Sequence, residues 1–482
     1  MAKRAPLWGE RTAVVDIGEE EVLTYSDLAE RIEVATGRLA AWGVNPGDQI
    51  CVLARNRLDV LAMLFGARRR GATLAPVSYR LAPETATKLV DRIDPELTVV
   101  EADFESHVTD VESAVVGFDE YLSRHPERDV HGESDAAPLF LHTGGTTGVP
   151  KVVPITERQL EWNAITESVA WGLGDETVSV SVLPLFHTGG WNLLTLPTLY
   201  SGGKVVIMPE FDPGTTLECI EEHGATQLFA VAAIYRALAD HPDFEETDFS
   251  TVEWVMSGGG PCPESVMKPY RERGLTFVQG YGLTEGGPNN LYFPPERDDT
   301  VKKSESVGKP FPDCDARIVD EDGTPIDGPG TGELELAGPV TAEEYLEAEE
   351  GVFNEAAADG SRWISTEDIA RRDEDGDYYI VGRTDNMFIS GGENVYPEEI
   401  EDTLENHEDV EGVGVTPISH DKWGEVPRAV VVGAVSESDL DAFAREHLAD
   451  FEVPKEYVFV DELPETGAGK VDRDALDNEY GS

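Results

Sequence analysis

Short apolar runs recur along the chain and alternate with stretches of helical spacing. The runs are bounded by glycine, proline or polar residues, and they occupy 97–100, 177–183, 204–208, 227–231, 252–256 and 276–278. Runs this short and this apolar are typical of strands buried on both faces. Helical stretches such as 215–222 lie between them. This alternation predicts an α/β fold with a mostly parallel sheet.

The segment 26–42 is a clear predicted helix. Ser26 is its predicted N-cap, and Gly43 follows its end. The segment 49–54 is a predicted strand, and 320–332 is a predicted hairpin or loop rich in Gly, Asp and Pro. One face of the helix collects the apolar residues Leu28, Ile32, Ala35, Leu39 and Trp42.

A chain of 482 residues is long enough for two or more domains. A second unit is predicted to begin after 378–383, a YYIVGR segment. The organisation is therefore predicted as α/β, with a large N-terminal domain of mostly parallel β-sheets covered by helices in 1–382 and a small α+β domain in 383–482. The second unit is predicted to contain helices at 397–406 and 437–449 and strands at 410–415, 429–435 and 457–460.

Acidic residues outnumber basic residues by 95 to 37, which gives a formal net charge of −58. A surface of this sign repels phosphate backbones and anionic lipids, so nucleic acid and membrane surfaces are not expected partners. A large core is still expected, because 40% of the residues are hydrophobic. No apolar run is long enough for a membrane span, and the first ten residues lack the apolar stretch of a signal peptide.

The four cysteines are scattered and include no CxxC pair; they are Cys51, Cys219, Cys262 and Cys314. Their spacing argues against a disulfide framework or a zinc site and predicts a reducing, cytoplasmic location. The acidic residues are spread along the chain, and lysine supplies only 11 of the 37 basic residues. We interpret this pattern as a halophilic surface, because concentrated salt screens like charges while carboxylates hold water. An acidic protein without salt adaptation is the alternative.

The most informative motif is TGGTTGVPK, which ends at Lys151 and follows an apolar run at 138–141. Its glycines let backbone N–H groups approach an anion, its threonines offer hydroxyls and a Mg²⁺ ligand, and Lys151 adds a charge suited to phosphate. The spacing is not that of a Walker A loop. A polar turn is the competing interpretation, and Lys151 favours phosphate. The other candidate residues of this loop are Thr143, Gly144, Gly145, Thr146, Thr147 and Gly148.

A second motif, QGYGLTE at 279–285, follows the predicted strand at 276–278. Glycines on both sides of Tyr281 leave its ring open to stacking by a base. Thr284 and Glu285 offer the hard oxygen atoms that Mg²⁺ prefers. The SGGG segment at 257–260 follows another predicted strand and is expected to line the opposite wall of a flat pocket. Each segment is also compatible with an ordinary turn.

Isolated candidates occur in three further segments. His187 follows a predicted strand, although a lone histidine is more often structural than catalytic. Asp368 and Arg383 bracket the predicted domain boundary. The Asp368 carboxylate can accept two hydrogen bonds from a ribose diol, although surface acids are common in this chain. Lys470 lies in a Gly-rich turn near the C-terminus, where a solvated lysine is the simpler interpretation.

Together and in this order, the motifs resemble those of the AMP-forming acyl-CoA synthetases of the adenylate-forming superfamily, which includes luciferases and peptide-synthetase adenylation domains. The resemblance covers about 24–473, and its most specific matches are TGGTTGVPK, QGYGLTE, the segment 382–401 and the pair 469–470. It implies that a carboxylic acid and MgATP give an acyl-adenylate and pyrophosphate. The thiol of coenzyme A then displaces AMP to give acyl-CoA, with Mg²⁺ and lysines offsetting the charge that develops.

The resemblance implies an ATP-binding role for each motif. The loop 143–151 would hold the β- and γ-phosphates, with Thr146 and Glu285 as Mg²⁺ ligands. Thr284 would contact the α-phosphate. Asp368, together with Arg383, would bind the ribose. The implied adenine pocket and its neighbours are Gly258, Gly259, Gln279, Gly280, Tyr281 and Gly282.

The resemblance also implies catalytic roles for Lys470, His187, Thr284 and Glu285. Lys470 matches the lysine that bridges the substrate carboxylate and the α-phosphate during adenylation. His187 matches a position between the acyl pocket and the thioester-forming site.

The implied coenzyme A contacts lie in the small C-terminal domain, at Ser390, Gly391 and Gly392. Asp385 falls at the hinge about which this mobile domain turns between the two half-reactions. Two positions depart from the family pattern. Glu367 stands where glycine commonly precedes the ribose aspartate, which we interpret as surface adaptation. Ser390 stands where several relatives carry a basic or another small residue, which leaves the coenzyme A contacts open.

The predicted acyl pocket contains His187, Gly189, Gly190, Trp191, Gly258, Gly280 and Gly286. Because glycine has no side chain, the glycines are expected to leave room for acids larger than acetate. Trp191 is expected to line the pocket or to pack behind it. No basic residue near these motifs marks a second substrate carboxylate, which favours a medium- or long-chain fatty acid or an aryl acid. The compact length and the segment 421–424 are reminiscent of succinylbenzoate ligases, so o-succinylbenzoate–CoA ligase stays an alternative.

Other functions remain open from the sequence. Transfer of the acyl group to a carrier-protein thiol would replace coenzyme A. A phosphotransferase would produce ADP in place of AMP and pyrophosphate, and a non-catalytic acidic binding protein would tolerate Lys470→Ala. The oligomeric state is also open, with a homodimer as one option.

Overall fold

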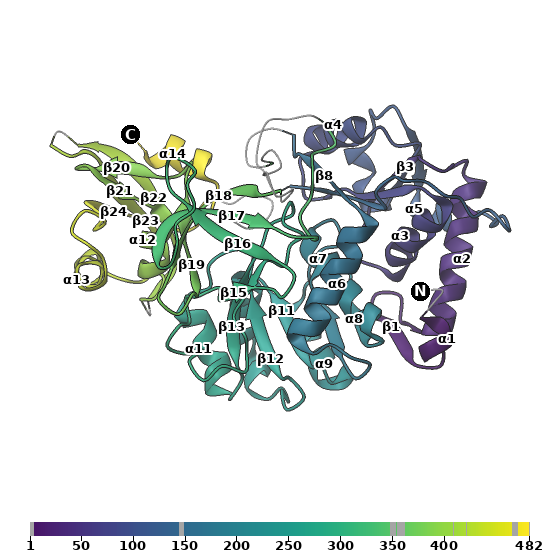
Figure 1. The fold of residues 1–482 in the computed structure, drawn as a ribbon, viewed down its shortest axis with the longest axis horizontal. Helices are drawn as coiled ribbons and strands as arrows, with labels where there is room; N and C mark the ends of the chain where they lie inside the picture. Colours follow the sequence, from purple (N-terminus) through teal and green to yellow (C-terminus); the bar gives the residue numbers. More distant parts are fainter. Residues whose placement is uncertain are drawn as a thin grey trace.

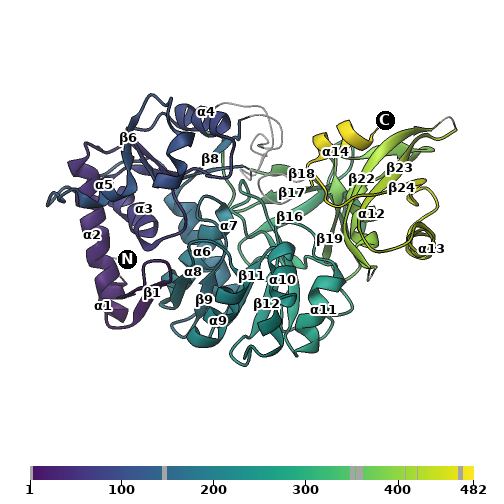
Figure 2. The same cartoon turned by 180° about the vertical axis from the view of Figure 1, so that it is seen from behind.

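Four β-sheets and the helices around them make up the computed structural model of the chain (Figures 1 and 2). It describes residues 4–143, 149–347, 353, 362–407, 409–420, 422–464 and 471–481. In both views the purple-to-teal N-terminal part lies on one side and the yellow-green C-terminal part on the other, with β16–β19 between them. Among the described helices, none combines the length and apolar character needed to cross a membrane.

The largest sheet has nine strands, in the order β15-β14-β13-β12-β11-β9-β10-β1-β2. The strands from β13 to β1 pair in parallel, and only the outer strands β2, β14 and β15 pair antiparallel. The bounds are β1 (Thr12–Asp16), β2 (Glu21–Thr24), β9 (Val178–Ser181), β10 (Lys204–Ile207), β11 (Gln227–Ala230), β12 (Trp254–Ser257), β13 (Phe277–Tyr281), β14 (Leu291–Tyr292) and β15 (Lys309–Pro310).

A second sheet has six strands, in the order β6-β5-β3-β4-β7-β8, and is parallel except for the β7–β8 pair. Most strands of the two sheets follow the apolar runs of the sequence, so the predicted mostly parallel α/β organisation is confirmed. The bounds are β3 (Gln49–Leu53), β4 (Thr73–Pro76), β5 (Leu97–Val100), β6 (Ala114–Gly117), β7 (Leu139–His142) and β8 (Val152–Ile155).

The third sheet, β16-β17-β18-β19, is antiparallel throughout and lies outside the predicted parallel pattern. Strands β16, β17 and β18 carry charged residues among their apolar ones, because one face meets solvent, so these three lack the continuous apolar runs of the parallel strands. The β16–β17 connection falls in the predicted hairpin at 320–332. The bounds are β16 (Asp315–Val319), β17 (Gly330–Ala337), β18 (Ile364–Arg372) and β19 (Tyr378–Arg383).

The C-terminal sheet, β21-β20-β23-β22 with β24 paired to β23, has its own hydrophobic core. The chain leaves the third sheet after Arg383 and enters this one at Phe388. The division into 1–382 and 383–482 with a hinge near Asp385 stays a prediction. The bounds are β20 (Phe388–Ser390), β21 (Glu393–Val395), β22 (Val410–His420), β23 (Gly424–Gly433) and β24 (Glu456–Phe459).

Helices cover the parallel sheets and both faces of the C-terminal sheet (Figure 1). Helix α2 buries its predicted apolar face, but the predicted N-cap Ser26 is wrong. Thr24 is the N-cap: its hydroxyl accepts from Asp27 N, and the Asp27 carboxylate accepts from Thr24 N, which is a capping box. The helices are α1 (Ala5–Trp8), α2 (Tyr25–Ala41), α3 (Leu58–Arg70), α4 (Pro83–Ile93), α5 (Phe118–Ser123), α6 (Glu157–Trp171), α7 (Thr188–Asn192), α8 (Thr195–Ser201), α9 (Pro213–His223), α10 (Ala232–Ala239), α11 (Glu264–Glu272), α12 (Pro397–Leu404), α13 (Glu437–His447) and α14 (Arg473–Tyr480), with 3₁₀ turns at Ala102–His107 and Pro242–Glu245.

Polar contacts join the C-terminal part to α10 and α11. The backbone N–H of Glu264, the first residue of α11, donates to Asn406 Oδ1 at 2.9 Å. Arg236 of α10 donates to the carbonyl of Glu411 at 2.6 Å. Since Pro263 offers no side-chain cap to α11, Asn406 supplies the missing acceptor.

Candidate active site

The predicted phosphate loop connects two buried strands. Strands β7 and β8 pair antiparallel, and Thr143 N donates to the Lys151 carbonyl at 2.9 Å, which closes the base of the loop. The loop residues Gly144, Gly145, Thr146, Thr147 and Gly148 lie outside the described residues. The structure therefore fixes where the loop starts and ends, and both ends lie at the edge of the six-stranded sheet.

A buried histidine supports the start of this loop. His142, the last residue of β7, accepts a hydrogen bond at Nε2 from Ser78 N at 3.1 Å. Burial lowers the pKa of His142 to about 4, although a bond to the Thr143 carbonyl opposes the shift. His142 is therefore neutral at ordinary pH, and sequence reasoning missed it because a single histidine within an apolar run carries no motif.

Glu285, the predicted Mg²⁺ ligand, is buried, and its position is fixed by Tyr345. The Tyr345 hydroxyl donates to Glu285 Oε1 at 2.8 Å, and Ala342 N donates to the Glu285 carbonyl at 2.7 Å. Lys151 Nζ lies 4.7 Å from the centre of the Tyr345 ring. Tyr345 thus connects the predicted phosphate lysine with the predicted metal ligand. Its segment matches none of the motifs above, so no sequence signal points to it. Thr284, next to Glu285, is buried too.

The predicted ribose pair lies directly beside the predicted adenine residue. Asp368 and Arg383 are register partners on β18 and β19, and Arg383 Nη1 lies 3.3 Å from Asp368 Oδ1. The Tyr281 hydroxyl, at the end of β13, donates to Asp368 Oδ2. Burial, followed by the charge of Asp368, raises the pKa of Tyr281 well above its ordinary value. The Tyr281 hydroxyl therefore stays protonated and keeps donating to Asp368, which holds the Asp368 carboxylate at the end of β13 in the nine-stranded sheet.

Residues 366–368 form a bulge in β18. The register between β17 and β18 shifts there, and Asp368 N donates to the Thr366 hydroxyl at 3.1 Å. Glu367 has a φ of +60°, in the left-handed region that favours glycine. For a residue with a Cβ this conformation costs about 1–2 kcal/mol. The bulge aims Asp368 towards Tyr281, as bulges near active sites commonly do.

Glu367, interpreted as surface adaptation, has a side chain that is 53% exposed, and its carboxylate also lies 3.0 Å from Arg383 Nη2. The interpretation as surface adaptation stays a prediction. Asp385, in the predicted hinge, lies 2.9 Å from Arg383 Nε. Arg383 therefore contacts three carboxylates, two from β18 and one from the segment that leads to the C-terminal sheet. Burial opposes its charge, but these carboxylates outweigh burial and raise its pKa further.

The remaining predicted adenine residues lie at the ends of β12 and β13. A Cβ on Gly258 would lie 2.8 Å from the Phe229 ring and 3.1 Å from the Gly280 carbonyl, so the two glycines are neighbours. Gln279 accepts from Cys262 N at 3.0 Å and donates to the Ser304 carbonyl at 2.7 Å, so its amide already has structural partners. Gly259 and Gly282 lie beside these glycines in the same two strand-end segments.

A small apolar pocket, with a volume of about 10 Å³, lies beside this wall. It is bounded by the end of β9, by α7 and α8 and by the Phe229 ring. Phe229, which sequence reasoning missed, separates the pocket from Gly258. Its lining residues are Val180, Ser181, Val182, Leu183, Gly189, Leu193, Leu194, Thr195 and Phe229.

Two glycines that were expected to leave room for substrate do not do so. A Cβ on Gly190 would lie 2.1 Å from the Pro184 carbonyl, so its missing side chain allows α7 to pack on the preceding turn. A Cβ on Gly286 would lie 2.2 Å from Asn290 Oδ1. Trp191 is fully buried in the N-terminal core and packs behind the site. Of the predicted set only Gly189 lines the pocket, next to half-buried His187, which accepts from Gly189 N at 3.4 Å.

The predicted coenzyme A loop lies at the turn between β20 and β21. Ser390 is buried, and Gly391 and Gly392 have φ values of +64° and +101°. Gly391 N donates to the Trp423 carbonyl at 2.9 Å, and the Trp423 ring covers Gly391. Lys470, the predicted adenylation lysine, lies outside the described residues.

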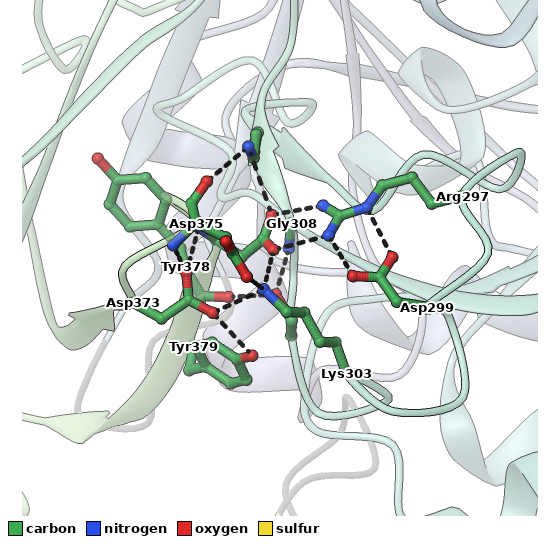
Figure 3. A network of polar contacts seen from close by, with 11 residues as sticks. Arg297, Asp299, Lys303, Gly308, Asp373, Asp375, Tyr378 and Tyr379 are labelled. Atoms are coloured by element: carbon green, nitrogen blue, oxygen red, sulfur yellow. Dashed lines mark hydrogen bonds and ion pairs between the residues drawn. The ribbon is translucent and has the colours of Figure 1, made fainter. Parts of the chain in front are cut away.

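At the other end of the β18–β19 hairpin, an acidic turn surrounds a lysine (Figure 3). The carboxylates of Asp373, Asp375 and Asp377 lie within 4.8 Å of one another. Lys303 Nζ is 2.9, 2.8 and 2.6 Å from them, and Arg297 pairs with buried Asp377 at 2.6 Å. An ammonium group thus fills the position that a cation would take, and the cluster fixes the hairpin that carries the ribose pair.

Comparison with known proteins agrees with this geometry. Residues 1–346 match the family described as AMP-binding enzyme, and residues 399–470 match its C-terminal domain. Feruloyl-CoA synthase from Amycolatopsis sp. is 34% identical over 99% of this chain and 98% of its own length. Indoleacetate–CoA ligase from Aromatoleum aromaticum is 32% identical over 97% of this chain and 96% of its own.

Solved structures show the same arrangement. The O-succinylbenzoate coenzyme A synthetase from Bacillus subtilis, in complex with ATP and magnesium ion, superposes with a TM-score of 0.89 at 26% identity, over 99% of this chain and 98% of that one. The match to one family over most of the chain, with relatives above 30% identity along its length, shows that the protein belongs to the AMP-binding enzymes and is an AMP-forming acyl-CoA synthetase.

Proposed function

We propose that this enzyme activates an aryl monocarboxylic acid with MgATP and transfers the acyl group to coenzyme A. The observation that carries the proposal is the apolar wall around Phe229, whose cavity of about 10 Å³ must open further for a ring to enter. None of the described residues that line it carries a charge, which suits an uncharged ring and gives no partner for a second carboxylate. Its neighbour Gly258 belongs to the predicted adenine wall, so a ring held there would have its carboxylate close to the nucleotide.

Relatives that act on ring-bearing acids support this choice. Feruloyl-CoA synthase, indoleacetate–CoA ligase and 2-succinylbenzoate–CoA ligase all match along nearly the full chain. A medium- or long-chain fatty acid and o-succinylbenzoate are the alternatives. The uncharged lining counts against o-succinylbenzoate, because its second carboxylate would be buried without a cation.

We assign the nucleotide contacts as follows. The loop 143–151 holds the phosphates, Tyr281 stacks on adenine, Asp368 and Arg383 bind the ribose, and Thr284 contacts the α-phosphate. Glu285 suits Mg²⁺, because its carboxylate is buried and already oriented by Tyr345, and Thr146 is the second proposed ligand. When bound with ATP, Mg²⁺ would offset charge on the phosphates.

The residues divide the chemistry between two steps. In the first, the substrate carboxylate attacks the α-phosphorus and pyrophosphate leaves, with Lys470 placed between the carboxylate and the α-phosphate. In the second, the thiol attacks the acyl carbon and AMP leaves. Residues 383–482 turn about Asp385 between the steps and bring Ser390, Gly391 and Gly392 to the pantetheine channel, while His187 lies between the two reaction positions.

A screen of pyrophosphate release tests the proposal. Ferulate, indoleacetate, benzoate, o-succinylbenzoate and straight-chain fatty acids would each be supplied with MgATP, with and without coenzyme A. We expect the highest kcat/KM for a ring-bearing monocarboxylate and AMP as the nucleotide product. A preference for fatty acids would overturn the substrate assignment. Product formation only with a carrier-protein thiol would overturn the assignment of coenzyme A.

We also propose that the enzyme is adapted to concentrated salt and works in the cytoplasm. The net charge of −58 and the four buried, unpaired cysteines support this. In molar KCl the repulsion between surface carboxylates is screened. The denaturation midpoint is therefore expected to rise with KCl concentration, and a midpoint that is equal in dilute buffer would overturn the salt adaptation.

A further inference from the structure

Arg383 lies between two groups of carboxylates that belong to different parts of the chain. From β18, Glu367 lies 3.0 Å from its Nη2 and Asp368 lies 3.3 Å from its Nη1. Asp385, in the segment that leads to the C-terminal sheet, lies 2.9 Å from its Nε and accepts from Nη2 at 3.3 Å. Glu367 and Asp385 thus compete for Nη2, and the position of Arg383 depends on the balance between them.

Glu367 keeps this contact in spite of an unfavourable backbone. Its φ is +60°, and its carbonyl accepts from Thr384 N at 2.8 Å, so the conformation is fixed by the pairing of β18 with the chain beyond β19. Glycine would adopt this conformation without strain. Such a conformation persists where the surrounding structure holds it, and here the Glu367 side chain also makes an ion pair with Arg383.

We infer that Glu367 is a positioning residue for ATP: it holds Arg383 beside Asp368, on the ribose side, against Asp385. This inference rests on the proposed function, because it takes Arg383 and Asp368 as the ribose contacts. Without the charge of Glu367, Arg383 stays paired with Asp385 and turns away from the ribose more readily. The effect falls on ATP binding and spares the steps that follow it.

Two substitutions separate charge from backbone. Glu367→Gln removes the charge but leaves a residue with a side chain in the strained left-handed conformation. Glu367→Gly removes the charge and also relieves the backbone strain. ATP binding would be measured by calorimetry in about 1 M KCl, where the Debye length is about 3 Å, so that repulsion between distant acids and ATP is screened. We expect both variants to raise the Kd for ATP about two- to fivefold, as loss of one partly exposed ion pair would. The kcat at saturating ATP stays unchanged.

Glu20 and Asp129 provide matched controls. They are exposed acidic residues with φ values of +52° and +55°, and they lie outside the site. Glu20→Gly and Asp129→Gly relieve the same kind of strain and remove one surface charge. We expect their thermal midpoints to rise and their Kd for ATP to equal that of the unmodified enzyme.

The outcomes distinguish this inference from the proposed function. Unchanged or tighter ATP binding in both Glu367 variants would overturn the inference, and so would equal weakening in the two controls. If either of these results is found and the unmodified enzyme still binds ATP and releases pyrophosphate, the inference about Glu367 is wrong and the proposed function still holds. An unmodified enzyme that binds no ATP would overturn both.

Discussion

The hydroxyl of Tyr345 donates a 2.8 Å hydrogen bond to Oε1 of Glu285. Both side chains are buried, and the tyrosine ring also lies 4.7 Å from the ammonium of Lys151. A single aromatic side chain thus contacts the groups proposed for the metal and for the phosphates. The orientation of Glu285 therefore depends on the segment 339–346, which carries Tyr345, as well as on its own motif.

Tyr345→Phe removes the hydroxyl and keeps the ring. Because groups that orient a metal ligand commonly contribute 10- to 100-fold to metal affinity, we expect the half-saturating Mg²⁺ concentration to rise by about tenfold. Pyrophosphate release would be titrated with Mg²⁺ at fixed ATP. Tyr25→Phe is the control, since the Tyr25 hydroxyl donates to Gly203 in a buried position away from the site. Equal Mg²⁺ dependence in the two variants would contradict the prediction.

Phe229→Ala is expected to enlarge the apolar pocket. The ring separates the pocket from Gly258, so its loss should favour acids bulkier than the preferred one. Because a methylene in a pocket changes selectivity by about 10- to 200-fold, we expect the ratio of kcat/KM for a bulky acid to that for a small one to rise by about tenfold or more. KM for ATP serves as the internal control. An unchanged ratio of the two kcat/KM values would show that the acyl group does not bind beside Phe229.

His142→Gln tests the buried neutral histidine at the phosphate loop. The pKa of His142 is lowered to about 4 in the folded chain, so below about pH 6.5 the unfolded chain binds a proton that the folded chain does not. Stability is therefore lost as the pH falls from about 6.5 to about 4, by about 3 kcal/mol in total. Glutamine can accept from Ser78 N without titrating.

The measurement is the denaturant midpoint between pH 4 and 7. The variant should lose less stability than the unmodified enzyme across this window. His125→Gln, at an exposed histidine, provides the control for the substitution itself. Parallel curves for the unmodified enzyme and His142→Gln would show that another group causes the acid loss.

Lys303→Met leaves three aspartates without their central cation. Burial opposes charge on Asp373, but Lys303 and backbone N–H groups outweigh it and lower its pKa to about 2, so its stabilising effect is present above about pH 4 and lost on acidification towards 2. Removing the lysine should destabilise the fold by about 2 kcal/mol at neutral pH, because buried Asp377 loses one charged partner and keeps Arg297. Lys88→Met, in an exposed pair with Glu84, should have little effect on the denaturant midpoint.

Lys470→Ala separates the two half-reactions. The variant should lose formation of the acyl-adenylate by several orders of magnitude and still convert a supplied acyl-adenylate to acyl-CoA. Asp385→Pro should do the reverse, because proline restricts the backbone rotation that the hinge requires. Pyrophosphate release and thioester formation would be assayed separately. Equal loss of both steps in Lys470→Ala would remove its assigned role.

Much of the fold was predictable because the parallel strands are continuous apolar runs. Strand β5 has the predicted bounds, and α9 and β11 lie within a few residues of prediction. The antiparallel sheet was not foreseen, since its strands carry polar residues on one face. The N-cap was misplaced because Ser26 and Thr24 are both good caps, and only the reciprocal bonds with Asp27 decide between them.

The site was predictable where residues occur in motifs and unpredictable where they act through space. Tyr281, Asp368 and Arg383 lie in contact, as the resemblance implied they would be close. Tyr345 and Phe229 contact the site from segments with no motif, so only the three-dimensional arrangement identifies them. Gly190 was misjudged because the sequence does not say whether a missing side chain faces substrate or a neighbouring carbonyl.

The lysine inside the acidic turn has a practical consequence for work with chelators. Because the ammonium of Lys303 is covalently part of the chain, a chelator cannot remove it and another cation cannot exchange with it. A chelating agent should therefore leave the β18–β19 hairpin intact, and any loss of turnover that it causes reports on the Mg²⁺ proposed to accompany ATP.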